Sequence, residues 1–211
     1  MILATPYAEG LTDYTDYTAY LIRRGKLLNH VHLIVARPED EAAAYEFGEK
    51  LADNFRSSHT CILAPKARSA NETAVDLLRA ALRFARDYKA GEGELPDPAM
   101  LYMSPDYRPN ENGWLDQIQS EYYLKRGPMV FGKFEPNGAK TLQGPAVFRK
   151  DFYQKSGLLS TVPPNIHWRL YLQHEILNNA VETKLIGHGK DCVLQGKARR
   201  KKPAAPTSDD V

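Results

Sequence analysis

Four short apolar segments in the first half of the chain, each closed by a proline, constrain its fold more than any other feature. They occupy residues 2–5, 31–36, 60–64 and 100–103, and the prolines that follow are Pro6, Pro38, Pro65 and Pro105. Proline lacks the backbone N–H that a sheet requires, so it marks the ends of strands. Stretches with helical spacing separate the four segments. This alternation of strand and helix predicts a parallel sheet with helices on both faces and right-handed connections.

The intervening stretches are predicted as helices over residues 11–28, 39–55 and 75–88. Apolar side chains recur on one face of each at helical spacing. The third stretch follows a predicted capping box, in which Ser69 is the N-cap and Glu72 lies three residues further on. The first half of the chain therefore contains both the strands and the helices of a doubly wound sheet.

The second half has a different pattern. We predict a helix over 113–124, two strands over 129–134 and 146–148 that pair beside the parallel sheet, helices over 151–156 and 167–179, and a last strand over 183–187. The predicted fold class is α/β, a single domain with a mostly parallel central sheet, helices on both faces and a small additional β element. We assign residues 1–192 to this domain. Residues 193–211 form a basic tail, which from Lys197 has too little apolar surface to fold.

Composition excludes few functions. Hydrophobic residues make up 43% of the 211 positions and charged residues 26%, as in ordinary globular proteins. The net charge of +2 is too small to indicate nucleic acid as a partner by itself. No apolar run approaches the roughly 18 residues of a membrane-spanning helix, and the first residues lack the basic segment of a signal peptide. Cys61 and Cys192 do not suggest a structural disulfide. We therefore expect a cytoplasmic protein without a membrane partner.

A lone carboxylate, Asp106, follows the fourth apolar segment in the sequence Ser104-Pro-Asp-Tyr-Arg-Pro109. Ligands of open α/β sheets bind at the carboxyl ends of the strands. A carboxylate there can hold a divalent cation against a diphosphate, because Mg²⁺ sites combine one or two carboxylates with substrate phosphates. The alternative interpretation is an aspartate in an ordinary turn after a strand.

The order of these segments resembles the GT-A-fold nucleotide-sugar glycosyltransferases, and most closely their small phage-type members. The matching stretches lie between Ala4 and about Gly189, and they are residues 4–7, 69–72, 102–109, 113–115, 130–132 and 142–148. The resemblance implies a single GT-A-like (Rossmann-like) domain. It also implies transfer of a sugar from a nucleotide-sugar donor, with a UDP-sugar as the expected donor, to an acceptor hydroxyl.

The resemblance also implies a donor site. The loop after the first strand would contact the nucleotide base and ribose, through Thr5, Pro6 and Tyr7. The diphosphate would face Lys66, Arg68 or Asn71, since Lys and Arg are natural phosphate partners. The alternative for these three residues is a helix-start cap and two surface cations. Gly144 and Pro145 would line the donor-sugar or acceptor side, with a β-bulge as the alternative.

A metal site follows from the same resemblance. Ser104 and Asp106 stand at the first and last positions of the family's Asp-x-Asp motif, and Ser104 departs from it. Asp106 would be the direct ligand of Mn²⁺ or Mg²⁺, and His188 the second ligand, with a surface-loop histidine as the alternative. The departure at Ser104 weakens metal affinity by one negative charge or removes the dependence on metal altogether.

The general base stays open at this stage. Arg169 occupies a position where related proteins commonly have an acid, and the nearby candidates are His167, His174 and Glu175. Of these, His167 and Glu175 join Asp106 as the predicted catalytic residues. Neither inversion nor retention can be assigned, and the oligomeric state is not predicted.

The acceptor is predicted from the resemblance alone. The phage-type members glycosylate hydroxymethylated pyrimidines in DNA, which would place this protein in a host cytoplasm. The basic residues 197–202 would attract phosphates, although such tails also serve as solubilising ends. Two alternatives remain. A nucleotidyltransferase normally has a glycine-rich, basic loop after its first strand, which residues 4–10 lack. A non-catalytic nucleic-acid-binding protein on a degenerate transferase fold is favoured by Ser104 and Arg169.

Overall fold

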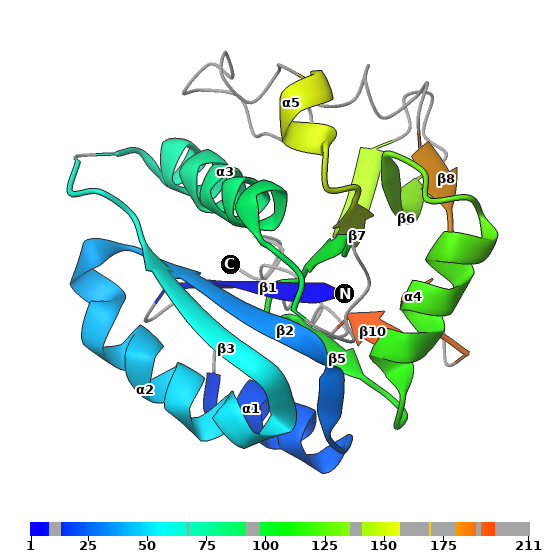
Figure 1. The fold of residues 1–211 in the computed structure, drawn as a ribbon, viewed down its shortest axis with the longest axis horizontal. Coiled ribbons are helices and arrows are strands. Elements are labelled where there is room, and N and C mark those ends of the chain that lie inside the picture. Colours follow the sequence, from blue (N-terminus) through cyan, green and yellow to red (C-terminus); the bar gives the residue numbers. More distant parts are fainter. Residues whose placement is uncertain are drawn as a thin grey trace, which may run out of the picture.

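A seven-stranded sheet with the order β3-β2-β1-β4-β7-β6-β8 forms the centre of the computed structural model (Figure 1). The structure describes residues 1–8, 14–66, 68–91, 98–135, 141–156, 169, 180–188 and 191–196. The strands are β1 (Ile2–Tyr7), β2 (Leu27–Ala36), β3 (Phe55–Ile62), β4 (Met100–Tyr102), β6 (Val130–Glu135), β7 (Thr141–Phe148) and β8 (Ala180–Glu182). β1 to β4 pair in parallel, β7 is antiparallel to β4 and β6, and β8 is parallel to β6. The predicted α/β class with a mostly parallel sheet is confirmed.

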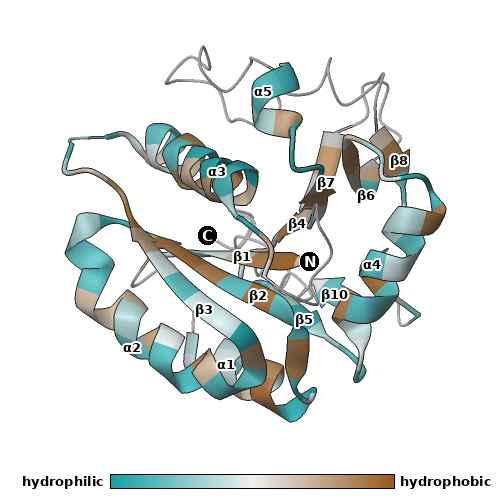
Figure 2. Cartoon of the chain, in the orientation of Figure 1, coloured by the Kyte–Doolittle hydropathy of each residue, from teal (hydrophilic) through white to brown (hydrophobic). Residues whose placement is uncertain are grey.

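Helices cover both faces of the sheet (Figure 1). One face packs against α1 (Tyr14–Arg23), α2 (Glu41–Leu51) and α4 (Trp114–Leu124), and the other against α3 (Ala70–Asp87) and α5 (Phe152–Ser156). The short 3-10 turns η1 (Pro38–Asp40) and η2 (Ala52–Asn54) flank α2. Figure 2 shows hydrophobic residues along β1, β2, β4 and β7, whereas β3 is mostly neutral to hydrophilic and the outer faces of the helices are mainly hydrophilic.

The central parallel strands are buried on both faces. Leu3 and Ile34 pack toward α1 and α2, whereas Ile2 and Leu33 pack toward α3. All four side chains are fully buried. Parallel strands buried in this way appear in the sequence as continuous apolar runs, and the apolar segments over 2–5 and 31–36 have this character.

β1 continues through Pro6, although the sequence predicted that it stops there. Beyond Ala4, β1 has a neighbour on one side only, because β4 ends at Tyr102, the partner of Ala4, while pairing with β2 continues to Tyr7. Met103 N donates to Ala4 O at 2.9 Å, so residue 4 faces the β4 side. The backbone of Pro6, two residues further along, is directed to the same side, where β4 has already ended. The N–H that proline lacks would therefore have had no strand partner there.

The predicted pairing of two strands beside the parallel sheet is confirmed, because β6 and β7 pair antiparallel. The predicted hairpin extends the main sheet, since β7 pairs directly with β4. A separate three-stranded sheet has the order β5-β10-β9 and contains β5 (Tyr107–Pro109), β9 (Ile186–Gly187) and β10 (Leu194–Gly196). Of the predicted last strand over 183–187, only residues 186–187 form a strand, β9, which lies in the three-stranded sheet. Residues 194–196, assigned to the tail from the sequence, form β10, and Leu194 is fully buried.

Two predicted helix ends are also wrong. α1 ends at Arg23, Gly25 has φ +88°, and Leu27 and Leu28 enter β2 instead of continuing the helix. α2 ends at Leu51, and the chain then enters β3 at Phe55. The predicted capping box is confirmed: the backbone N–H of residue 72 donates to Ser69 Oγ at 3.3 Å, and that of Ser69 donates to Glu72 Oε2 at 2.8 Å. Apart from residue 169, the predicted helix over 167–179 lies outside the described residues.

A buried histidine in β2 makes the stability of the fold dependent on pH. His32 is fully buried, its Nε2 lies 3.2 Å from Thr5 Oγ1, and its ring stacks on Phe55 with centroids 4.7 Å apart. Burial lowers the pKa of His32 from its ordinary value to about 3. The unfolded chain, with a histidine pKa near 6.5, therefore binds a proton that the folded chain excludes. Stability is retained above that unfolded value and declines as the pH falls toward 3.

We expect the free energy of unfolding to fall by roughly 2 kcal/mol from pH 7 to pH 5 because of the proton that His32 binds only in the unfolded chain. Urea unfolding at both pH values measures this loss, with the His32→Gln variant as the comparison. The variant lacks the titrating ring, so its loss over the same interval should be smaller by that amount. Equal losses in both proteins would show that His32 is not the group responsible.

Candidate functional site

The four parallel strands of the first half end at one edge of the sheet. β1 ends at Tyr7, β2 at Ala36 and β3 at Ile62, and these ends are aligned by the parallel register. β4 ends beside Ala4, so the residues that follow it emerge next to the end of β1. Ser104 and Asp106 are therefore located at the carboxyl edge, as the sequence predicted, where open α/β sheets bind their ligands.

A tight turn exposes Asp106. Tyr107 N donates to Ser104 O at 3.1 Å, which closes a four-residue turn with Pro105 at its second position. Pro105 and Tyr107 are buried, Ser104 is half-buried, and Asp106 between them is exposed. No hydrogen bond or ion pair to the Asp106 carboxylate occurs within the described ranges. This carboxylate is available to a ligand.

Tyr107 brings together residues that are far apart in the sequence. Its side chain lies against Gly144, where an added methyl group would come within 2.1 Å of Tyr107 Oη. Its ring centroid lies 6.0 Å from that of His188. Asp106, Gly144 and His188, three of the predicted site residues, are therefore gathered around one buried tyrosine. Sequence reasoning missed this role, because a three-residue strand such as β5 leaves no periodic signal.

Gly144 and Pro145 form an irregularity in β7. Pairing with β6 shifts register between Gly132, opposite Ala146, and Lys133, opposite Gln143, so residues 144 and 145 have no direct partners there. Gly144 has φ +72°, a conformation that glycine adopts without strain. The β-bulge that the sequence left as an alternative is therefore present. It lies at the carboxyl edge because Ala146 pairs with Tyr102 at the end of β4.

Arg169 contacts the same group of residues, although it is far from Tyr107 in the sequence. Its Nη2 donates to Gly144 O at 3.3 Å. Burial lowers the pKa of Arg169 below its ordinary value, and nearby Tyr107, Tyr102 and Asp106 partly restore it. The guanidinium is therefore within electrostatic reach of the Asp106 carboxylate. The sequence alone indicates only that Arg169 stands where related proteins commonly have an acid.

The predicted nucleotide contacts in β1 are mostly occupied by the protein. The Thr5 side chain is fully buried, with Oγ1 3.3 Å from Tyr17 Oη. The Tyr7 ring stacks on Tyr14 with centroids 4.1 Å apart. Tyr14 Oη also donates to Pro6 O at 3.0 Å and accepts from the N–H of residue 8 at 2.9 Å. A nucleotide here would meet half-buried Pro6 and the backbone rather than the side chains of residues 5 and 7.

The three predicted diphosphate contacts after β3 have different environments. Arg68 Nε donates to Asp76 Oδ2 at 2.7 Å, and its Nη1 donates to the carbonyls of Ala64 at 2.9 Å and Lys66 at 3.0 Å. Arg68 therefore connects this loop to α3, and its role as a phosphate ligand stays a prediction. Lys66 is exposed and Asn71 is half-buried in the first turn of α3. Helix N-termini favour anions, so these two residues remain suitable.

The predicted catalytic residues His167 and Glu175, together with His174, lie outside the described residues. Their positions relative to Asp106 are therefore untested. The general base remains a prediction from the sequence.

The side chains at this edge supply some, but not all, of the ligands that a divalent cation needs. Within the described ranges, no three His, Cys, Asp or Glu side chains come together as a metal site. Asp106 and His188, both exposed beside Tyr107, offer one carboxylate and one imidazole. That pair is chemically appropriate for Mn²⁺ or Mg²⁺. Two protein ligands do not fill a coordination sphere, so phosphate oxygens and water would have to complete it.

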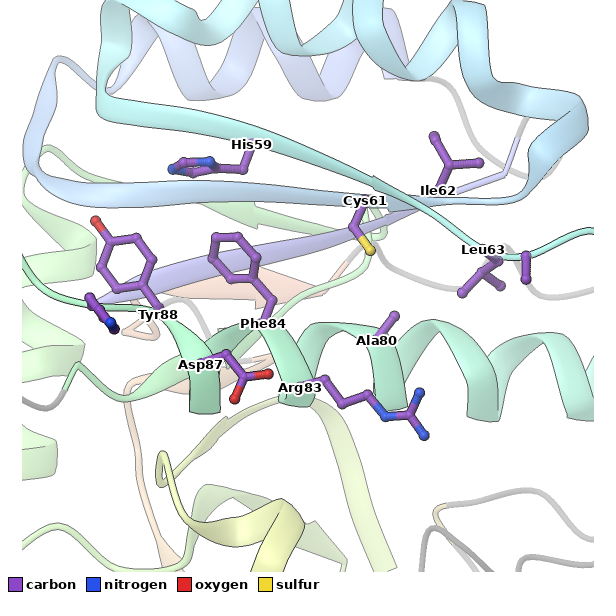
Figure 3. Close-up of a pocket in the computed structure, with 11 residues that line it drawn as sticks. His59, Cys61, Ile62, Leu63, Ala80, Arg83, Phe84, Asp87 and Tyr88 are labelled. Carbon is purple, nitrogen blue, oxygen red and sulfur yellow. The ribbon is translucent and has the colours of Figure 1, made fainter.

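A cavity of about 670 Å³ lies elsewhere, between β3 and α3 (Figure 3). His59 and Cys61 line it from β3, Phe84 lines it from α3, and Tyr88 lines it from the position that follows α3. Burial raises the pKa of the Cys61 thiol above its ordinary value. None of the lining residues belongs to β4, β5 or β7, so the cavity is distinct from the Asp106 turn. No motif in the sequence predicts it.

Solved glycosyltransferase structures share this fold. GlyE from Streptococcus pneumoniae TIGR4 aligns with a TM-score of 0.57 and 8% identity, over 87% of this chain and 45% of that one. The bifunctional glycosyltransferase WbbM aligns with a TM-score of 0.60 and 10% identity, over 95% of this chain and 46% of that one. The mannosyltransferase PcManGT from Pyrobaculum calidifontis, in complex with GDP-Man and Mn²⁺, aligns with a TM-score of 0.56 and 10% identity, over 86% and 54%.

These likenesses establish a GT-A-like α/β fold and no more, because the identities are so low. The chain spans about half the length of these three proteins. No protein-family model and no curated protein sequence matches the chain. Within the described residues, every helix is too short or too polar to cross a membrane.

Proposed function

We propose that this protein is a nucleotide-sugar glycosyltransferase whose donor binds at the carboxyl edge of β1 to β4. The observation that carries the proposal is the exposed Asp106 carboxylate, presented by a turn at the place where this fold binds ligands. The fold shared with several glycosyltransferases supports it.

The donor diphosphate would face the turn that carries Asp106, with Lys66 and the first turn of α3 attracting its negative charge. Asp106 and His188 would hold Mn²⁺ or Mg²⁺. When bound, such a cation would neutralise the departing nucleotide diphosphate. The donor sugar or the acceptor would lie beside the bulge at Gly144 and Pro145, where the Tyr107 ring already fills the space next to residue 144. The base that takes the acceptor proton would come from His167 or Glu175.

The finer assignments belong to the same proposal. UDP is the nucleotide that the resemblance implies, whereas PcManGT was captured with GDP-Man. The proposed acceptor is a hydroxymethylated pyrimidine in DNA, toward which the basic residues 197–202 would supply attraction that weakens with salt.

The test is a donor panel that contains both UDP- and GDP-sugars, with and without Mn²⁺. Release of nucleoside diphosphate is measured alone and with hydroxymethylpyrimidine DNA, and the mass of the DNA bases is then read. We expect one donor to release its nucleotide and to leave a hexose on the modified base. Release without a DNA adduct would retain the transferase and reject the acceptor. Retention of DNA without release from any donor would favour the non-catalytic nucleic-acid-binding alternative.

A further inference from the structure

The imidazole of His188 lies directly against the backbone of Gly196. A Cβ atom added at Gly196 would come within 2.5 Å of His188 Cε1 and 2.8 Å of His188 Nδ1. Both distances are too short for non-bonded atoms, so only a residue without a side chain leaves room for the ring. The φ of Gly196 is outside the left-handed region, so space alone, and not backbone conformation, calls for glycine at this position.

Pairing between the short strands brings these groups together. Gly196 in β10 pairs antiparallel with Tyr107 in β5, and β10 pairs in parallel with β9, whose last residue precedes His188. The backbone of His188 has a further contact, because Gln195 Nε2 donates to His188 O at 3.4 Å. The three-stranded sheet therefore places the imidazole beside the residue that follows Asp106.

The imidazole is the group that would move if residue 196 carried a side chain. The added Cβ would also lie 3.1 Å from Tyr107 Cε1, but Tyr107 is buried and already lies against Gly144. His188 is exposed, so its ring has other staggered rotamers open toward solvent. A methyl group at residue 196 would therefore displace the imidazole and leave the strands in place.

A displaced imidazole would be a poorer metal ligand. Metal sites tolerate deviations of only about 0.2 Å in their ligand distances, and groups that orient a metal-binding histidine affect metal affinity strongly. The ring atoms of His188 nearest to Gly196 are Nδ1 and Cε1, which leaves Nε2 as the nitrogen that a cation would reach. The space above Gly196 therefore decides where that nitrogen lies.

We propose that Gly196 positions His188 for the divalent cation, by leaving the space in which the imidazole lies against β10. This inference rests on the proposed function, in which Asp106 and His188 hold the cation beside the donor diphosphate. It adds to that site a residue from the stretch that the sequence assigns to the basic tail.

Two measurements on Gly196→Ala test the proposal. The first is the proton NMR shift of His188 Cε1–H in the metal-free protein, identified by its absence in His188→Gln. We expect this signal to move toward the value of a solvent-exposed histidine, because the imidazole moves away from Tyr107, whose ring centroid is 6.0 Å from its own. The second is Mn²⁺ binding, measured by electron paramagnetic resonance of the free ion, with and without UDP or GDP. We expect the Kd for Mn²⁺ to rise about 10- to 100-fold.

The matched control is Gly187→Ala in β9. An added Cβ there meets Cys192 Sγ at 3.2 Å and no atom of the imidazole within 4 Å, so this variant perturbs the same sheet without displacing the ring. Its Mn²⁺ affinity and its His188 signal should stay as in wild type. Gly196→Ala should melt close to the temperature of wild type, because the exposed imidazole gives way to the methyl group.

The outcomes separate this inference from the function on which it rests. An unshifted His188 signal, or a Mn²⁺ affinity equal to that of wild type, would overturn the role of Gly196 and leave the cation site standing. Equal losses of affinity in Gly187→Ala and Gly196→Ala would overturn it too, because the sheet as a whole would then be responsible. Unfolding of Gly196→Ala would show that the imidazole does not give way, with the same consequence. No Mn²⁺ binding by wild type in any mixture would instead reject the cation site itself, and this inference with it.

Discussion

Replacing Asp106 by asparagine should lower sugar transfer by roughly 100- to 1,000-fold, while the protein melts at the same temperature as wild type. The expected loss corresponds to several kcal/mol of charge stabilisation, the size attributed to a metal ion acting on a leaving group. The melting temperature should not change, because Asp106 is exposed and the described structure shows no hydrogen bond or ion pair to its carboxylate. Substitutions at such surface positions usually change stability by no more than about 0.5 kcal/mol.

The matched control is Asp53→Asn. Asp53 is also an exposed carboxylate, but it lies in η2, just before β3 begins at the opposite edge of the sheet. Steady-state rates of nucleotide release and acceptor modification should change only in the Asp106 variant. A variant at residue 106 with wild-type transfer would remove this turn from the reacting centre. Equal losses in both variants would indicate a general effect of surface charge on donor attraction.

The position of Asp106 could be predicted because its cause is local. The apolar run over 100–103 and the proline after it define where β4 ends, and the alternation of strands and helices places that end at the ligand-binding edge. The capping box at Ser69 was predictable for the same reason, since both partners lie within one helical turn.

The environment of Asp106 could not be predicted in this way. It depends on β5, β9 and β10, which are two or three residues long and leave no periodic pattern. Leu27 and Leu28 suit a helix as well as a strand, and only pairing with β3 places Leu27 in β2. The side chains of residues 5 and 7 are buried in the protein because β1 continues past Pro6. The length of β1 depends in turn on where the neighbouring strand β4 ends.

The contact between Gly144 and Tyr107 is the most consequential of these non-local features, and replacing Gly144 by alanine tests it. Two costs are expected. The left-handed φ of +72° disfavours any residue with a side chain by about 1–2 kcal/mol, and the new methyl group would lie 2.1 Å from Tyr107 Oη. Overpacking of this kind adds about 1–3 kcal/mol. Urea unfolding should therefore show a combined loss of roughly 2–5 kcal/mol.

Gly25→Ala separates the two costs. Gly25 has φ +88°, but an added methyl group there would meet no atom within 4 Å, so this variant carries the backbone strain without the collision. Its free energy of unfolding should fall only by the cost of the backbone strain. Nucleotide binding should weaken in Gly144→Ala and stay unchanged in Gly25→Ala, because only residue 144 displaces the tyrosine beside Asp106 and His188.

A double-mutant cycle then identifies Tyr107 as the obstructing group. Tyr107→Ala alone should destabilise the protein, since it removes a buried aromatic ring that is 8% exposed. In combination with Gly144→Ala, the total loss should be smaller than the sum of the two single losses, because the methyl group then enters the space that the ring has left. Additive losses would show that the substitution at residue 144 acts only through the backbone. Tyr107 would then not link the bulge in β7 to the turn that presents the carboxylate.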